Sequence, residues 1–240
     1  MIYIYIAVAA LLVISFLLYK FVYKSESWVK KRAVKKAKKE KEIENKNAQK
    51  LLDQYLQASL NGVEIGKLYE RYIGYLYESE GAEVKYNGAV ASFSDFGRDL
   101  IVKTEEGIHI VQTKRWASFK KIHEKHIFQI YGSAMHYLID SNITNTVVKP
   151  VFYTSATYTD SAREVAEVLG VELYQVPLDK SFPMIKCNVS KSGQKIYHLP
   201  IDPYYDKIKI KIENGDCFVF TVSEAVAKGF RRARNYKYAA

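Results

Sequence analysis

The chain has 240 residues, which is enough for one medium-sized domain with small attachments. Its hydrophobic fraction of 48% and charged fraction of 26% are those of a folded protein, so wholesale disorder and a collagen-like repeat are excluded. Only two cysteines, Cys187 and Cys217, are present. A disulfide scaffold is therefore excluded, and we expect a reducing compartment.

The net charge of +10 is unevenly distributed along the chain. Residues 20–50 carry +8, residues 51–180 carry −4 and residues 181–240 carry +6. Because the excess lies in a short linker and a C-terminal tail, the basic composition alone does not indicate what the central region binds.

The N-terminus contains an uninterrupted apolar run, IYIYIAVAALLVISFLLY, at residues 2–19. About 20 such residues cross a bilayer as a helix, so we expect a transmembrane helix at residues 1–23. Tyrosines near both ends are typical of the two membrane interfaces: Tyr3, Tyr5, Tyr19 and Tyr23. A cleaved signal peptide is the alternative, but the basic start and the small-residue cleavage site are missing.

Basic residues follow the apolar run, and none precedes it. The positive-inside rule then predicts a single-pass protein of a bacterial inner membrane, with the N-terminus outside and residues 24–240 in the cytoplasm. Residues 24–60 read as a basic helical stalk, which is either solvated or in contact with anionic lipid head groups.

The central region alternates between helical and strand patterns. Residues 62–80 show helical spacing and end at Gly81, and residues 119–140 form a second helical stretch. Thr159 is expected to cap a third helix that ends at Leu169. Strands are predicted at 82–86, 99–103, 108–115, 147–153 and 171–175. This order predicts an α/β domain with a mixed sheet at residues 61–180.

The second and third predicted strands form a hairpin that places three polar residues together. If Lys103 pairs with Ile108 across the turn, Asp99 lies opposite Gln112 and Lys114 points to the same face. Oxygen atoms of a carboxylate and a carboxamide suit Mg²⁺, and a lysine can stabilise charge that develops on a phosphate. The alternative is a simple cross-strand salt bridge between Asp99 and Lys114.

Several motifs in this order resemble one protein family. They are Gly66-Lys-Leu-Tyr-Glu-Arg-Tyr-Ile, Gly81, Asp95-Phe-Gly-Arg-Asp-Leu, Val111-Gln-Thr-Lys-Arg-Trp116 and Val151-Phe-Tyr-Thr-Ser-Ala-Thr-Tyr-Thr-Asp-Ser-Ala162. Together they resemble the Mrr-like branch of the restriction-endonuclease, or PD-(D/E)xK, superfamily, in its Gln-x-Lys variant.

The resemblance covers about residues 60–176 and implies a restriction-endonuclease-like sheet flanked by helices. It implies that Asp99 is the principal metal ligand, Gln112 the second ligand position and Lys114 the catalytic lysine. Glu70 corresponds to the helix glutamate that supports the metal. Arg115 and Trp116 match the positions that follow the motif.

Other histidines and aromatic residues have simpler interpretations. His123 and His126 are expected on a solvated helix face, because no metal-protease spacing accompanies them. His109 and the tyrosines of residues 69–77 are expected to pack in the core.

Residues 181–240 read as a small, basic α+β accessory module that resembles a module appended to bacterial nuclease-like proteins. Asn214-Gly is expected to form a hairpin turn, and Thr221–Ala227 a capped helix that ends at Gly229. The basic cluster suits phosphate contacts or is a solvated tail: Arg231, Arg232, Arg234 and Lys237. Zinc binding by Cys187, Cys217 and His198 is a weak alternative, because no CxxC pair is present.

Together these features predict a membrane-anchored, Mg²⁺-dependent endodeoxyribonuclease, with Mn²⁺ as a substitute and foreign or modified DNA as the substrate. The expected partners are DNA, membrane lipid through residues 1–23 and the stalk, and a second copy of the chain in a homodimer. The alternatives are a membrane-tethered DNA-binding protein with a silent nuclease fold, and a nuclease that acts on RNA.

Overall fold

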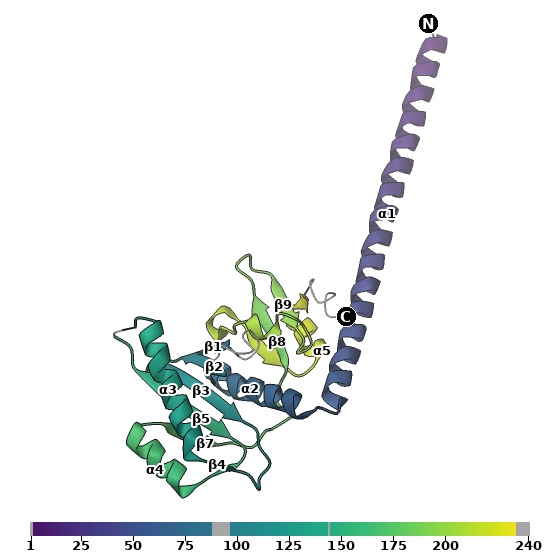
Figure 1. Ribbon diagram of the computed structural model, residues 1–240. Coiled ribbons are helices and arrows are strands. Elements are labelled where there is room, and N and C mark those ends of the chain that lie inside the picture. The colour runs from purple at the N-terminus through teal and green to yellow at the C-terminus, as the bar shows by residue number, and fades with distance from the viewer. Residues whose placement is uncertain (1, 88–96, 144, 234–240) are drawn as a thin grey trace. The chain divides into compact units, whose positions relative to one another are not determined.

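The structure is a computed structural model that describes residues 2–87, 97–143 and 145–233, without the side chains of residues 2–14, 22 and 25–27. The chain divides into two compact units, residues 1–48 and residues 49–240. The first unit is purely helical, and the second contains the sheets (Figure 1).

Helix α1 (Ile2–Gln57) makes up the first unit and continues into the second. It contains residues 2–23 of the predicted transmembrane segment and residues 24–57 of the predicted stalk as one continuous helix. Among the residues that the structure describes with side chains, no helix is long and apolar enough to cross a membrane. Most of the predicted transmembrane segment lies outside those residues, because the side chains of 1–14 are not described. The prediction of a transmembrane helix at residues 1–23 is therefore not confirmed.

A five-stranded mixed sheet organises the centre of the second unit. Its strands lie in the order β1 (Glu83–Tyr86), β2 (Leu100–Lys103), β3 (Ile108–Lys114), β5 (Val148–Thr154) and β7 (Glu172–Gln175). β1, β2 and β3 pair antiparallel, whereas β3, β5 and β7 pair parallel. This arrangement confirms the predicted mixed sheet.

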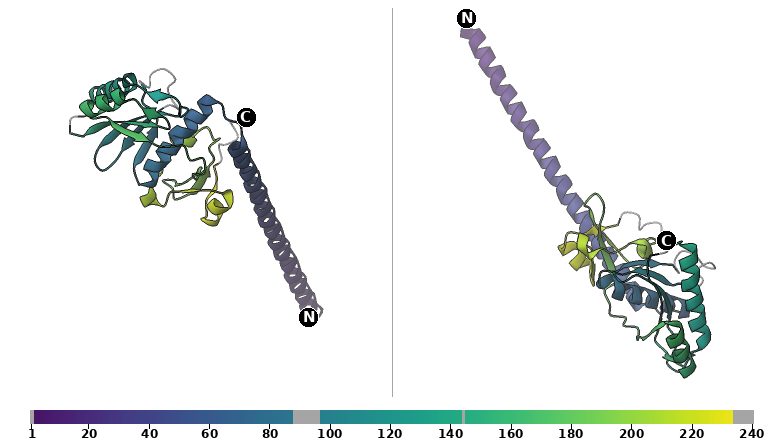
Figure 2. Two further views of the ribbon diagram at one scale, coloured as in Figure 1. Left: turned by 90° about the horizontal axis from the view of Figure 1, so that it is seen from below. Right: turned by 90° about the vertical axis from the view of Figure 1, so that its left-hand side faces the viewer.

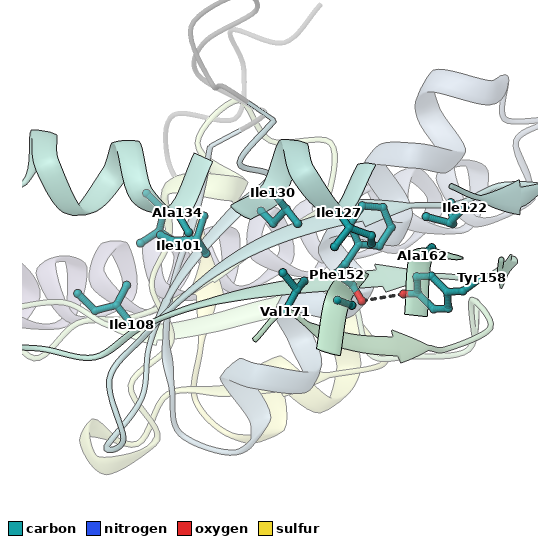
Figure 3. Packing of buried hydrophobic residues seen from close by; sticks show 12 residues of the cluster. Ile101, Ile108, Ile122, Ile127, Ile130, Ala134, Phe152, Tyr158, Ala162 and Val171 are labelled. Atoms are coloured by element: carbon teal, nitrogen blue, oxygen red, sulfur yellow. Dashed lines mark hydrogen bonds between the residues drawn. The ribbon is translucent and has the colours of Figure 1, made fainter. Parts of the chain in front are cut away.

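Helices cover both faces of this sheet (Figure 2). Helix α2 (Gly62–Ser79) packs on one face through Tyr69, Ile73 and Tyr77. Helices α3 (Glu124–Asp140) and α4 (Asp160–Leu169) cover the other face. Figure 3 shows the core beneath α3 and α4, including Ile127, Ile130 and Phe152, each fully buried.

Local capping explains why α2 and α4 begin and end where the sequence predicts. Asn61 accepts hydrogen bonds from the backbone N–H groups of Val63 and Glu64, and the Glu64 side chain bonds back to the Asn61 N–H. The Thr159 hydroxyl accepts from the Ala162 N–H, and α4 is followed by Gly170 at a φ of 66°.

The second helical stretch starts later than predicted. We expected a helix from residue 119, but α3 begins at Glu124, and residues 121–122 form the short strand β4 (Lys121–Ile122). β4 pairs parallel with β6 (Thr157–Tyr158), and the Ile122 side chain is fully buried. Burial of Ile122 therefore outweighs the local helical pattern.

The C-terminal region forms a separate four-stranded sheet. Its strands lie in the order β10 (Cys217–Val219), β8 (Ile185–Val189), β9 (Lys195–His198) and β11 (Arg231–Arg232). The predicted helix is present as α5 (Val222–Ala227), with Thr221 as its N-cap and Gly229 at a φ of 85°. We call residues 181–233 the C-terminal module.

One prediction for the module is wrong, and one disfavoured alternative is also ruled out. Asn214-Gly does not form a hairpin turn, because it ends the 3-10 helix η2 (Ile212–Asn214) after the short 3-10 helix η1 (Tyr205–Lys207). The zinc alternative also fails. Cys187 pairs with Cys217 across strands, but the pairing of Lys186 with His198 places the histidine on the other face of the sheet.

Buried ion pairs join the module to α2. The Lys186 ammonium lies 3.0 Å from the Glu78 carboxylate, and the two side chains are 1% and 0% exposed. Arg71 donates two hydrogen bonds to Asp206, at 2.7 and 2.9 Å. The module therefore packs directly on the helix that carries Glu70.

Candidate functional site

The predicted hairpin has the expected register, and this register places Asp99. Lys103 pairs with Ile108 and Leu100 with Val111, so Asp99 lies one residue before β2, alongside the end of β3. Its backbone N–H donates to the Val111 carbonyl at 2.9 Å. Its Oδ2 accepts hydrogen bonds from the Thr113 backbone N–H at 2.6 Å and from the Thr113 hydroxyl at 3.1 Å. The carboxylate is thus held at the start of β2, beside the end of β3.

Gln112 lies on β3 and is only 3% exposed. Its Oε1 is buried and has no hydrogen-bond partner among the described residues. Leaving a buried acceptor without a partner costs about 1–3 kcal/mol, so such a group usually has a functional reason. The orphaned carboxamide oxygen is the feature of this region that best suits a cation or a water molecule bound to one.

Gly97 allows two carboxamides to approach the backbone before β2. Its φ is 75°, and a Cβ atom there would lie 2.7 Å from Nε2 of Gln129 and 3.0 Å from Nε2 of Gln112. Both the backbone conformation and the close approach therefore require glycine. Asp95 and Phe96 of the same motif lie outside the described residues.

Glu70 lies on α2, next to Arg71. Burial, followed by the negative charges of Asp99 and Asp206, raises the pKa of its carboxyl to about 8, against the lowering effects of Lys67 and Arg71. The Glu70 side chain forms no hydrogen bond or ion pair with any described residue. Two carboxyl groups thus share one region, and a cation there would relieve their repulsion.

Lys114 ends β3, and its main chain is held by the neighbouring strand. Its carbonyl oxygen accepts hydrogen bonds from the Thr154 hydroxyl at 2.8 Å and from the Ser155 N–H at 3.3 Å. Its ammonium lies 5.6 Å from the centre of the Trp116 ring. Within the described chain Lys114 forms no ion pair, so the predicted alternative of a salt bridge with Asp99 is not observed.

The donor set fits a hard divalent cation better than zinc. In the described part of the chain, no three His, Cys, Asp or Glu side chains gather to hold a metal. The candidate site instead offers the Asp99 carboxylate, the orphaned Gln112 oxygen and, electrostatically linked to Asp99, Glu70. Oxygen donors in small number are the ligands that Mg²⁺ accepts while it keeps several waters.

Comparison with known protein families identifies this region. The family model of the Mrr catalytic domain, described as a restriction endonuclease, matches residues 65–177. Residues 65–177, a little under half of the chain, are therefore similar to a restriction-endonuclease catalytic domain. The four residues predicted for the site lie within the matched range: Glu70, Asp99, Gln112 and Lys114.

Other comparisons are less informative. No functionally curated protein matches the chain. A crystallised protein of unknown function is similar, with a TM-score of 0.35, 17% identity and coverage of 44% of this chain and 55% of that one. The MspJI restriction endonuclease in complex with a 27-mer oligonucleotide has a TM-score of 0.31, 14% identity and coverage of 45% and 24%. The chain therefore spans about half and about a quarter of these two proteins.

His126 differs from its prediction. It was expected on a solvated helix face, but its ring packs edge-on against Trp116 at 5.2 Å, and its Nε2 is buried without a hydrogen-bond partner among the described residues. Burial, followed by the charge of Lys114, lowers its pKa. The apolar neighbours Ile127 and Ile130 on the same helix could have indicated this burial.

Other predictions for individual residues have mixed outcomes. His109 is confirmed as a packed residue, since its ring contacts Tyr77 edge-on at 5.8 Å. Arg232 is 4% exposed and paired with Asp202, so it is not available for a phosphate. Arg234 and Lys237 lie outside the described residues.

Proposed function

We propose that the chain is a metal-dependent endodeoxyribonuclease of the Gln-x-Lys type, with its active site at Glu70, Asp99, Gln112 and Lys114. The observation that carries this proposal is the buried, partnerless Oε1 of Gln112 inside a restriction-endonuclease-like domain. A carboxamide oxygen held without a partner is poised to accept a cation or a water bound to one.

Each residue has a chemical role in this proposal. Asp99 and Gln112 hold Mg²⁺, or Mn²⁺ in its place, and Glu70 supports the metal once the cation lowers its raised pKa. When bound, the metal supplies Lewis-acid chemistry to a phosphodiester and to water. Lys114 orients the attacking water and stabilises the negative charge that develops on the phosphate.

DNA is the substrate that we propose, because the matching family is described as a restriction endonuclease. Restriction of foreign or modified DNA is the corresponding biological role. A membrane-tethered DNA-binding protein without catalysis is the competing function. RNA as the substrate is a further alternative, since the site chemistry acts on phosphodiesters in general.

We also propose that residues 1–23 anchor the chain in a bacterial inner membrane, with the N-terminus outside and the nuclease domain in the cytoplasm. This part rests on the apolar run at residues 2–19 and on the basic residues that follow it. Fractionation of cells that express the full chain, followed by protease treatment of spheroplasts, tests it. Recovery in the soluble fraction would contradict it.

The test of the nuclease uses the full-length chain in detergent with supercoiled plasmid. Nicking is measured with Mg²⁺, with Mn²⁺ and with a chelator. We expect metal-dependent nicking that falls at least about a hundredfold in Asp99→Asn and in Lys114→Ala.

Matched controls are the exposed Asp140→Asn and Lys180→Gln, which should cut like the original chain. Cleavage that survives Asp99→Asn would contradict the assigned site. Binding of plain and modified DNA without cleavage would favour the tethering function. Cleavage of RNA but not of DNA would show that RNA is the substrate.

A further inference from the structure

The loop that joins β3 to β4, residues 115–120, is held in place at several points. The Ser155 hydroxyl donates to the Trp116 carbonyl at 2.9 Å, and the Lys120 N–H donates to the Ala117 carbonyl at 2.9 Å. β4 then pairs with β6, and Ile122 is fully buried. This β3–β4 loop is therefore a preorganised element.

The tip of the β3–β4 loop presents an aromatic side chain to solvent. Phe119 is 82% exposed, which is more than any other aromatic side chain in the described part of the chain. A single exposed apolar residue on a surface is ordinary. A large aromatic side chain on a fixed loop directly after the candidate catalytic strand more strongly indicates a role in binding.

Positive charge surrounds this phenylalanine. Residues 114–125 contain five basic side chains, Lys114, Arg115, Lys120, Lys121 and Lys125, and one acidic side chain, Glu124. The sign is opposite to that of residues 51–180 as a whole, which carry −4. A local basic segment in a slightly acidic domain suits a phosphate backbone.

The loop is also physically linked to the candidate site. The ammonium groups of Lys114 and Lys120 each lie 5.6 Å from the centre of the same Trp116 ring. Because each ammonium lies 5.6 Å from the same point, the two groups are at most about 11 Å apart, so both can face one phosphate backbone.

We propose that the β3–β4 loop contacts duplex DNA next to the cut position, with Phe119 inserted as a wedge at a base step. Lys120 and Lys121 bind the flanking phosphates, and the apolar ring partly unstacks the bases, as inserted phenylalanine and leucine side chains do in DNA-bending proteins. The proposal rests on DNA being the substrate of the proposed function and adds how the chain engages it.

The test measures DNA unwinding, which requires neither cleavage nor a known recognition sequence. Full-length Asp99→Asn chain in detergent is bound to plasmid without divalent cations, the plasmid is relaxed by a metal-independent topoisomerase, and its topoisomers are resolved after the protein is removed. We expect a shift in linking number that is abolished by adding Phe119→Ala. We also expect Phe119→Ala to weaken DNA binding about tenfold.

Matched variants separate the wedge from general effects. Phe220→Ala removes a 57% exposed phenylalanine of the C-terminal module and should change neither the topoisomers nor the affinity. Lys121→Gln should make the slope of log affinity against log salt concentration shallower by about one unit, the effect of one lost phosphate contact. Lys180→Gln should leave this slope unchanged. Thermal unfolding of the chain should be unchanged by Phe119→Ala, because the side chain is exposed.

The outcomes distinguish this inference from the proposed function. Unchanged topoisomers and affinity in Phe119→Ala would overturn the wedge, even if the chain cuts DNA. A Phe119-dependent shift in a chain that never cuts DNA would support the wedge and overturn the nuclease.

Discussion

Two regions of the second unit bury polar groups in opposite ways. Where α2 meets the C-terminal module, the buried charges are paired: Glu78 with Lys186, and Arg71 with Asp206. In the candidate site, the carboxamide oxygen of Gln112 is buried without a hydrogen-bond partner among the described residues, and the pKa of Glu70 is raised to about 8. The buried groups of the first region are thus satisfied within the chain, whereas the Gln112 oxygen of the second has no hydrogen-bond partner among the described residues.

The two regions differ in whether their buried polar groups have partners within the chain. Breaking a buried ion pair leaves a desolvated charge, so the paired region should be sensitive to single substitutions. An orphaned acceptor already carries its desolvation cost, so removing it should cost little stability. The two regions should therefore respond oppositely to substitution.

The largest effect is expected in the paired region. Lys186→Met should lower the free energy of unfolding by about 3–5 kcal/mol, because it leaves the Glu78 carboxylate buried alone. The double variant Glu78→Gln with Lys186→Met should recover most of this loss. Urea unfolding of each variant measures both effects.

The control for this prediction is the more exposed pair of Lys209 and Glu83, 2.7 Å apart with side chains 51% and 32% exposed. Lys209→Met should cost less than about 1 kcal/mol. Equal losses for Lys186→Met and Lys209→Met would remove the distinction between buried and surface pairs.

A smaller loss is expected at Gly97. Gly97→Ala forces an alanine to a φ of 75° and places its Cβ 3.0 Å from Nε2 of Gln112, so we expect a loss of about 1–3 kcal/mol together with lost nicking. Gly170→Ala has a similar φ of 66° but open space around the Cβ, and should cost about 1 kcal/mol without lost nicking. Unimpaired nicking by Gly97→Ala would contradict the site.

A gain in stability is expected at Gln112. Gln112→Leu should leave the free energy of unfolding unchanged or raise it by about 1 kcal/mol while it abolishes nicking. Thr154→Val is the matched substitution of a satisfied buried group, whose hydroxyl donates to the Lys114 carbonyl at 2.8 Å and accepts from the Ala156 N–H at 3.0 Å. Thr154→Val should destabilise the chain. Equal destabilisation by Thr154→Val and Gln112→Leu would contradict the claim that only the Thr154 side chain is satisfied within the fold.

The most gradual effect is a pH dependence from Glu70, because it is spread over several pH units. Because its pKa is about 8 in the folded chain and 4.5 ordinarily, the folded state keeps a proton that the unfolded state releases between these values. Stability from this group is present below about pH 4.5 and is lost as the pH rises through 8. Urea unfolding with a chelator at several pH values should show a shallower fall for Glu70→Gln. The exposed Glu164→Gln should keep the original slope, and a shared slope for all three chains would contradict the raised pKa.

Local rules in the sequence were sufficient for the hairpin. The four-residue turn determined the register of β2 with β3, and this register places Asp99 next to the pair of Leu100 and Val111, where its carboxylate accepts hydrogen bonds from Thr113. The capping residue Thr159 likewise predicted where α4 begins, whereas the Asn61 cap of α2 became evident only in the structure.

Contacts between distant segments could not be predicted in the same way. Arg71 and Asp206 are separated by 135 residues, and no periodicity relates them. The late start of α3 depends on Ile122 being buried through β6, which is a tertiary effect. The orphaned state of Gln112 likewise appears only when the whole domain is packed around it.

We propose above all that Asp99 and Gln112 bind a divalent cation. Binding of Mn²⁺ to the full-length chain, monitored by electron paramagnetic resonance, tests this proposal without any substrate. We predict one strongly bound Mn²⁺ per chain, with binding at least about tenfold weaker in Asp99→Asn and unchanged in Asp140→Asn. Equal binding by the original chain and Asp99→Asn, or no binding by either, would contradict the claim.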